Sequence, residues 1–415
     1  MKPKVKNASY NGRLGNYDSD DRSETSLSTV TSNNTANSHT SGSSKTTTTY
    51  TGMELLKVKI RKCGGNTRHP KLLILYVQLG NEAFRSSDYV KAMEYYKQAI
   101  QCDKLAYDND ARKKSNGRSF SLRDKKANDQ HQREQNRLLG DAYANLGTVY
   151  WTTGQYENAI YMLQNALATY EFDHHARYRV NKSHSGNSMP QIASIYHQLG
   201  LAYSLCDNYT TALECLEYAK TLRESLGDAL SVAKTFDTIG RILFLQEQRQ
   251  GPKEASPVDG DENERTGNGD TTARSRLDEA LLQHQQALSI LNIYKTSEGA
   301  GDVQKNLLST LANMIKIYIY REEWNGAIEY YKEILHIQKN HLAASQASFG
   351  RVSPELFSLS SMSSPPAFQA QYKAVHDTLL QMSHCYQKLG LDPFANHCRQ
   401  EAALLAEEGG FLRDL

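Results

Sequence analysis

The chain has 415 residues, of which 39% are hydrophobic, and a net charge of +2. This near-neutral balance gives no bulk attraction to nucleic acid or to a membrane surface. No apolar run approaches the ~18 residues that span a bilayer, and the first residues have no apolar signal-peptide core. We therefore expect no membrane insertion, and a cytoplasmic location with the nucleus as the alternative.

The N-terminal segment, residues 1–52, is rich in serine and threonine. Between Ser23 and Thr51, 18 of 29 residues are Ser or Thr. Such a segment has almost nothing to bury, so we expect a disordered tail. Whether this tail is regulated by phosphorylation stays open. The following stretch, Met53–Ile60, is apolar enough for a short helix or an ordered arm.

A frame of small and aromatic residues then recurs six times. In the first copy Tyr76 precedes Gly80 by four residues, and Tyr89, Ala92 and Tyr96 follow that glycine at nine, twelve and sixteen residues. The copies lie near residues 73–104, 140–171, 193–226, 233–292, 308–340 and 376–408. Each contains two helical patterns of apolar residues at three- and four-residue spacing, joined by a short polar turn. Internal periodicity of this kind determines the architecture of the whole chain.

The small residues of the frame predict where the two helices of a copy cross. A glycine on the first helix and an alanine on the second add no bulk to the contact, so the backbones can approach closely. One pair cannot bury its apolar face alone, so the pairs must stack. The six alanines are Ala92, Ala159, Ala212, Ala280, Ala327 and Ala395.

The later copies match the frame less closely, and charged insertions interrupt the series. Residues 249–274 interrupt the fourth copy and carry six acids between Glu254 and Asp270 against Arg265. The stretch from Arg112 to Arg137 is basic. It is either a patch for nuclear import, phosphate or an acidic partner, or a solvated loop that leads into the next helix. In the sixth copy we expect Asp392 as a helix N-cap.

This frame resembles the tetratricopeptide repeat, most specifically in copies one to three. Copies three and four follow each other forty residues apart, which is similar to the repeats of kinesin light chains and cell-polarity adaptors. The resemblance implies an all-α fold, a right-handed superhelical solenoid of about six helix-turn-helix repeats with disordered insertions. The solenoid would span residues 53–408, and residues 409–415 would form a C-terminal tail.

We find no signature of catalysis. The sequence lacks a nucleophile elbow, a phosphate-binding glycine loop, a kinase signature and an HExxH motif. His384–Cys385 and His397–Cys398 suggest zinc, but adjacent residues on a helix point about 100° apart and cannot easily share one metal. We therefore expect no enzyme activity, no catalytic residue, no metal site and no cofactor.

The resemblance implies a peptide-binding groove along the first helices. The residue two places before each glycine would point into it, and five of these six residues are carboxamides. A carboxamide offers a donor and an acceptor, so a row of them can pair with a peptide backbone whatever its side chains. Alternatively, these residues only tie helices together. The series is Gln78, Asn145, Gln198, Thr238, Asn313 and Gln381.

Neighbouring positions suggest the chemistry of the peptide. Lys234, Arg241 and Lys316 would favour an acidic or phosphorylated residue in the partner. Phe84 and Trp151 would either clamp an apolar anchor or pack between copies.

The resemblance suggests one more activity to consider, the binding of a chaperone's terminal carboxylate, but the residues of this chain disfavour it. Co-chaperones of the family grip a terminal carboxylate with two asparagines, matched here by Asn81 and Asn145, and with several cations. The cationic positions hold Val77, Ser194 and Gln198. Without those cations a carboxylate loses most of its affinity, so we do not expect this activity.

The sequence is thus interpreted as a non-catalytic adaptor or scaffold that binds an extended partner peptide in its concave groove. Two alternatives remain. The chain could be a structural subunit of a larger complex that uses its convex face and insertions, or an accessory subunit of an enzyme.

Overall fold

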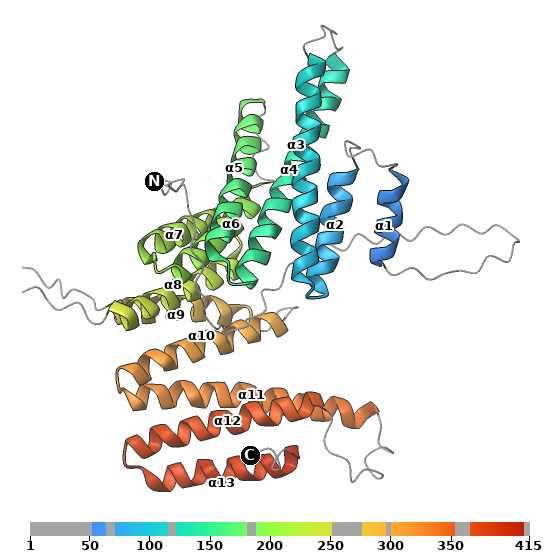
Figure 1. Cartoon of the computed structure of the whole chain (residues 1–415). Helices are drawn as coiled ribbons and strands as arrows, with labels where there is room; N and C mark the ends of the chain where they lie inside the picture. Colours follow the sequence, from blue (N-terminus) through green and yellow to red (C-terminus); the bar gives the residue numbers. More distant parts are fainter. Residues whose placement is uncertain are drawn as a thin grey trace, which may run out of the picture. The chain divides into compact units, whose positions relative to one another are not determined.

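The computed structural model describes residues 52–63, 71–114, 122–180, 188–250, 276–295, 300–352 and 366–410. In these ranges every regular element is an α-helix (Figure 1). The predicted N-terminal tail, most of the acidic insertion and part of the basic stretch lie outside them. The helices are α1 (Gly52–Lys62), α2 (Leu72–Arg85), α3 (Tyr89–Lys114), α4 (Leu122–Thr152), α5 (Tyr156–Val180), α6 (Met189–Leu205), α7 (Tyr209–Ser225), α8 (Ala229–Gln250), α9 (Arg276–Ile293), α10 (Ala300–Tyr320), α11 (Trp324–Val352), α12 (Pro366–Lys388) and α13 (Asp392–Gly409).

The chain divides into two compact units, Met1–Tyr218 and Ala219–Leu415, with the boundary inside α7. In the first unit α2 packs on α3 and α4 on α5, and the neighbouring pairs meet through α3–α4, α5–α6 and α2–α4 contacts. In the second unit α8 to α13 each pack on the next helix, and α8 also contacts α10. These stacked helix pairs confirm the predicted all-α repeat fold.

The crossing between paired helices depends on small residues, as the sequence predicts. All six frame alanines have 0% exposed surface. In the third pair, a Cβ added to Gly200 would lie 2.6 Å from Leu216 Cγ and 3.0 Å from the carbonyl oxygen of Ala212. The backbones are therefore close enough that even a methyl group on the first helix would clash.

The tight turns between helices share one backbone conformation. Each has a middle residue with positive φ, and in three turns that residue is not glycine: Ser87, Asp207 and Glu322. The backbone N–H of Glu323 then bonds the carbonyl of Tyr318 at 2.9 Å. This left-handed residue follows the end of the first helix, and the second helix begins two residues after it.

Replacing Glu322 with glycine is expected to stabilise the protein by about 0.5–1 kcal/mol. A glycine adopts the left-handed region without the steric cost that a Cβ brings, and Glu322 is exposed, with φ of 59°. Urea unfolding followed by circular dichroism measures the gain. The control is Glu323→Gly in the same turn, which has no positive φ to relieve and should not stabilise.

Several helices continue past the predicted repeat boundaries. α3 runs to Lys114, α5 to Val180 and α11 to Val352, beyond residues 104, 171 and 340. The apolar spacing ends at those boundaries, but no glycine or proline follows directly after them to stop the helix. The prediction of Asp392 as an N-cap is wrong by one residue. α13 begins at Asp392, and Leu391 is its N-cap without a side-chain cap bond.

Candidate peptide-binding surface

In the first unit, the predicted groove residues lie on the first helices α2, α4 and α6. α4 contacts both α2 and α6, so the three helices present a continuous row. Gln78 on α2 is exposed, whereas Asn145 on α4 and Gln198 on α6 are half-buried. The fold therefore brings these three carboxamides onto successive neighbouring helices.

Asn145 of this row bonds to Asn81, which lies three residues after Gln78 on α2. Asn145 Nδ2 donates to Asn81 Oδ1 at 3.0 Å, and the Tyr96 hydroxyl donates to the same oxygen at 2.6 Å. Asn81 and Asn145 therefore help to join α2, α3 and α4. Asn145 keeps its carbonyl oxygen and a second N–H for other partners.

Gln198 differs from the asparagines. Its Oε1 is buried and accepts no hydrogen bond from the described residues. A buried acceptor without a donor costs about 1–3 kcal/mol.

The two predicted aromatic residues are packed within the first unit. Trp151 lies against the cluster that includes Tyr96 and Leu146, and its Nε1 is buried without an acceptor among the described residues. Phe84 packs on Tyr89 with ring centroids 5.6 Å apart. Both rings therefore contribute to the core, and Trp151 is half-buried.

In the second unit, a buried polar cluster joins α8, α9 and α10. His284, with 0% of its side chain exposed, places Nδ1 2.9 Å from Asp237 Oδ1. Asn313 Nδ2 donates to both oxygens of Asp237 at 3.3 Å. Burial alone would raise the pKa of Asp237, but His284, with Asn313 and Arg241, holds that pKa below its ordinary value. Asn313 thus anchors α10 to α8.

The sequence contains a sign of this cluster that our comparison of the six repeat copies did not use. His284 occupies the frame position of Tyr96, Leu163 and Leu216, so it is a polar side chain at an apolar position. Its ring packs against Gly240, where an added Cβ would lie 2.7 Å from Nε2. A polar residue at such a position needs a buried partner, and Asp237 supplies it.

The remaining predicted groove residues of the second unit are exposed or half-exposed to solvent. Lys234, Lys316 and Gln381 are exposed, and Arg241 is half-exposed. The Tyr331 hydroxyl donates to Gln381 Oε1 at 3.0 Å, which leaves the amide N–H groups of Gln381 for another acceptor. The cations of α8 and α10 are thus accessible to a partner.

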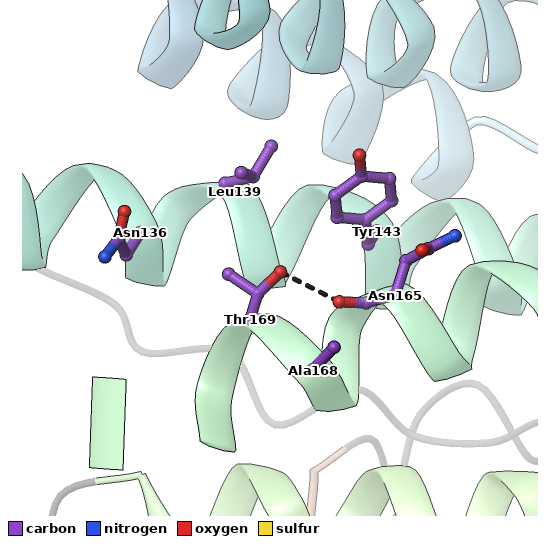
Figure 2. A pocket seen from close by; sticks show the side chains of 6 residues that line it. All are labelled: Asn136, Leu139, Tyr143, Asn165, Ala168 and Thr169. Atoms are coloured by element: carbon purple, nitrogen blue, oxygen red, sulfur yellow. Dashed lines mark hydrogen bonds between the residues drawn. The ribbon is translucent and has the colours of Figure 1, made fainter. Parts of the chain in front are cut away.

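A shallow pocket of about 340 Å³ lies between α4 and α5 (Figure 2). Thr169 Oγ1 donates to the Asn165 carbonyl at 2.8 Å at its edge. The lining holds no carboxylate, imidazole, thiol or amine and none of the predicted groove residues. It consists of Asn136, Leu139, Tyr143, Asn165, Ala168 and Thr169.

The described residues also bear on reactive chemistry and on membranes. Burial raises the pKa of the Cys206 thiol to about 11 and that of Cys215 to about 12, the opposite of an activated nucleophile.

In the described ranges, no group of three His, Cys, Asp or Glu side chains could hold a metal ion. None of the helices described is long and apolar enough to cross a membrane.

Family models of the tetratricopeptide repeat match residues 139–171 and 193–225, which lie within α4–α5 and α6–α7. No curated protein matches the chain.

Solved structures with similar folds include BtubC from P. vanneervenii, at 14% identity and TM-score 0.42, covering 69% of this chain and 87% of that one. A putative kinesin light chain from Podosopora anserina has 15% identity and TM-score 0.39, covering 64% and 94%. Aspartyl phosphate phosphatase F from Bacillus subtilis has 11% identity and TM-score 0.44, covering 84% and 73%.

Proposed function

Because the chain belongs to the tetratricopeptide repeat superfamily, we propose that it is a non-catalytic adaptor that binds an extended segment of a protein partner along its first helices. The observation that carries this proposal is the set of carboxamides that keep unused hydrogen-bonding capacity there. Gln78 and Gln381 are exposed, and Gln198 is half-buried.

Carboxamides suit this task because they pair with main-chain groups. An extended peptide presents an N–H and a C=O at every residue, and a carboxamide can accept from one and donate to the other. Each such bond contributes about 0.5–1.5 kcal/mol net. Selectivity would then come from neighbouring side chains, and an acidic or phosphorylated residue of the partner would gain from Lys234, Arg241 and Lys316. We place this activity in the cytoplasm.

The experiment that tests the adaptor function replaces the three glutamines of the series, of which Gln381 also accepts a hydrogen bond from the Tyr331 hydroxyl of α11. The variant Gln78→Ala/Gln198→Ala/Gln381→Ala leaves the Asn145–Asn81 and Asn313–Asp237 bonds in place. Losing three sets of main-chain bonds should weaken partner capture at least about tenfold. Affinity capture from cell extract, quantified by mass spectrometry, compares this variant with the unaltered chain.

The matched control replaces exposed amides on second helices, Asn158→Ala/Asn396→Ala/Gln400→Ala. This control should keep the partners of the unaltered chain. If the groove variant keeps them all and the control loses them, the chain binds through its second helices, as a structural subunit would.

A further inference from the structure

The first helices α8 and α10 touch directly, and we call the line of contact the α8–α10 seam. At one level of the seam Asn313 donates to Asp237, and further along the Tyr320 ring packs edge-on against the Phe244 ring, with centroids 5.6 Å apart. Each helix advances by seven residues between these two contacts, so the helices run parallel. A residue of α10 therefore lies level with the residue of α8 whose number is lower by 76.

This register brings two cations to the same level. Lys316 of α10 corresponds to position 240 of α8, so it lies one residue, or about 1.5 Å of helical rise, from the level of Arg241. Neighbouring helix axes lie about 8–10 Å apart. Arginine and lysine have long side chains, so their charged ends can meet on one group above the seam.

Both cations also lie on the same side of the seam. With 3.6 residues per turn, each residue is rotated by about 100° from the one before it. Arg241 is then rotated by about 50° to one side of the two α8 contact residues, and Lys316 by about 50° to the opposite side of the two α10 contact residues. On parallel helices that face each other, these opposite rotations point to the same side.

That side of the seam is open to solvent, whereas α9 covers the other side. Lys234 and Lys316 are exposed and Arg241 is half-exposed. On the covered side, a Cβ added to Gly240 would lie 2.7 Å from Nε2 of His284 on α9. A ligand can therefore reach the two level cations from solvent without displacing a helix.

The open side carries positive charge in excess. Among the residues that the structure describes, neither Arg241 nor Lys316 forms an ion pair, whereas Lys332 of α11 pairs with Glu329. The acid of the seam is Asp237, which already faces an imidazole of α9 and an amide of α10. Its charge also interacts with that of Arg241, so the guanidinium lies near the seam.

We propose that the open side of the α8–α10 seam binds one phosphate group, that of a phosphorylated serine or threonine in the partner segment. This inference rests on the proposed adaptor function and assigns the chemistry of one partner residue. A phosphorylated side chain carries a charge of about −1.5 to −2 at pH 7 and three acceptor oxygens. The fork of Arg241 can donate to two of these oxygens and the ammonium of Lys316 to the third.

Two cations at one level fit a phosphate better than a carboxylate. A single carboxylate brings one negative charge to two positive ones, so one cation stays uncompensated, whereas the second charge of a phosphate compensates both. The net charge of the whole chain is only +2, so no extended basic field attracts a polyanion such as nucleic acid. One isolated phosphate on a protein segment matches this charge distribution.

The test measures binding of the full chain to an array of synthetic peptides with one central phosphoserine and randomised flanking residues. Binding should exceed that to the matched serine array at least about tenfold. The variant Arg241→Gln/Lys316→Gln should reduce it to the serine level. The matched control Lys373→Gln/Arg399→Gln removes the same charges from α12 and α13 and should bind normally.

Two further measurements guard against a folding defect. Circular dichroism checks that the seam variant and its control are equally helical. Lys316→Gln alone removes no ion pair from the described residues, and it should already weaken phosphopeptide binding several-fold. Equal binding to the phosphoserine and serine arrays would overturn the proposal, as would equal losses in the seam variant and its control.

Other occupants give different results. Equally tight binding of an array with glutamate at the central position would make the site one for acidic residues in general, and the proposal fails. It also fails if vesicles that contain a phosphorylated inositol lipid bind more tightly and the seam variant abolishes that binding. If phosphopeptides bind only after residues 251–275 are replaced by a short linker, the occupant is the chain's own acidic stretch and the proposal again fails.

The adaptor function and this inference can fail separately. Loss of natural partners in the glutamine variant, with no preference for phosphopeptides, would leave the adaptor function standing and remove only the phosphate site.

Discussion

Replacing His284 with leucine is expected to lower the free energy of unfolding by about 2 kcal/mol at neutral pH. Leucine is the residue that the second and third repeats carry at this position, so local packing should be acceptable. Asp237, however, would lose the donor that lies 2.9 Å from its Oδ1. A half-buried carboxylate that loses its partner is costly. Urea unfolding followed by circular dichroism measures the loss.

The double variant Asp237→Ala/His284→Leu separates packing from pairing. It recreates the Ala144–Leu163 combination of the second repeat and leaves no buried charge at this crossing. We expect most of the lost stability to return, with a coupling free energy of about 1–2 kcal/mol in the double-mutant cycle. If the double variant is as unstable as the sum of the two single variants, the pair is not coupled and this account is wrong.

The same pair gives a pH dependence with a defined sign. The pKa of Asp237 is lower in the folded chain than its usual value, so its carboxylate stabilises the fold above the unfolded-state pKa of about 3.9. This contribution declines as the pH falls below that value toward the folded pKa. The variant Asp237→Asn should therefore show a flatter loss of stability with acid below about pH 4.

Replacing Gly200 with alanine is expected to destabilise the protein by about 1–3 kcal/mol. The new Cβ would lie 2.6 Å from Leu216 Cγ and 3.0 Å from the Ala212 carbonyl oxygen. Leu216 can yield only by leaving its rotamer, and the second contact is with backbone, so the helices must separate. This cost exceeds the gain of up to about 1 kcal/mol that alanine brings to a helix. Thermal unfolding by circular dichroism reports the change.

The control for this prediction is Gly301→Ala in α10. A Cβ at Gly301 meets nothing within 4 Å, so only helix propensity acts and the variant should be neutral or slightly more stable. Equal destabilisation of both variants would show that the close helix crossing is not what requires glycine at position 200.

The fold could be predicted from the sequence because its signal is local. The spacing from Gly200 to Ala212 lies within one helix pair, and the same spacing recurs along the chain. Residues at fixed short separation on two packed helices must meet whenever those helices form. The burial of the crossing alanines therefore follows from their sequence positions alone.

The polar contacts could not be predicted in the same way, because they join distant residues. Asn145 bonds Asn81 across 64 residues, and Asn313 bonds Asp237 across 76. These pairings depend on the relative register of helices from different repeats, which no local period encodes. The sequence analysis left open whether the carboxamides bind a peptide or only tie helices together, and the structure shows that Asn145 and Asn313 each bond a side chain of an earlier first helix.

The ion pair between Glu247 and Arg276 makes the junction between α8 and α9 tolerant of change in length. Because these two nearly buried side chains hold the helix ends together, a longer connection costs only loop-closure entropy, about 0.6 kcal/mol for each doubling. Evolution could expand or replace residues 251–275 without shifting the helices. For the same reason a fluorescent reporter spliced at this junction would leave the repeats intact.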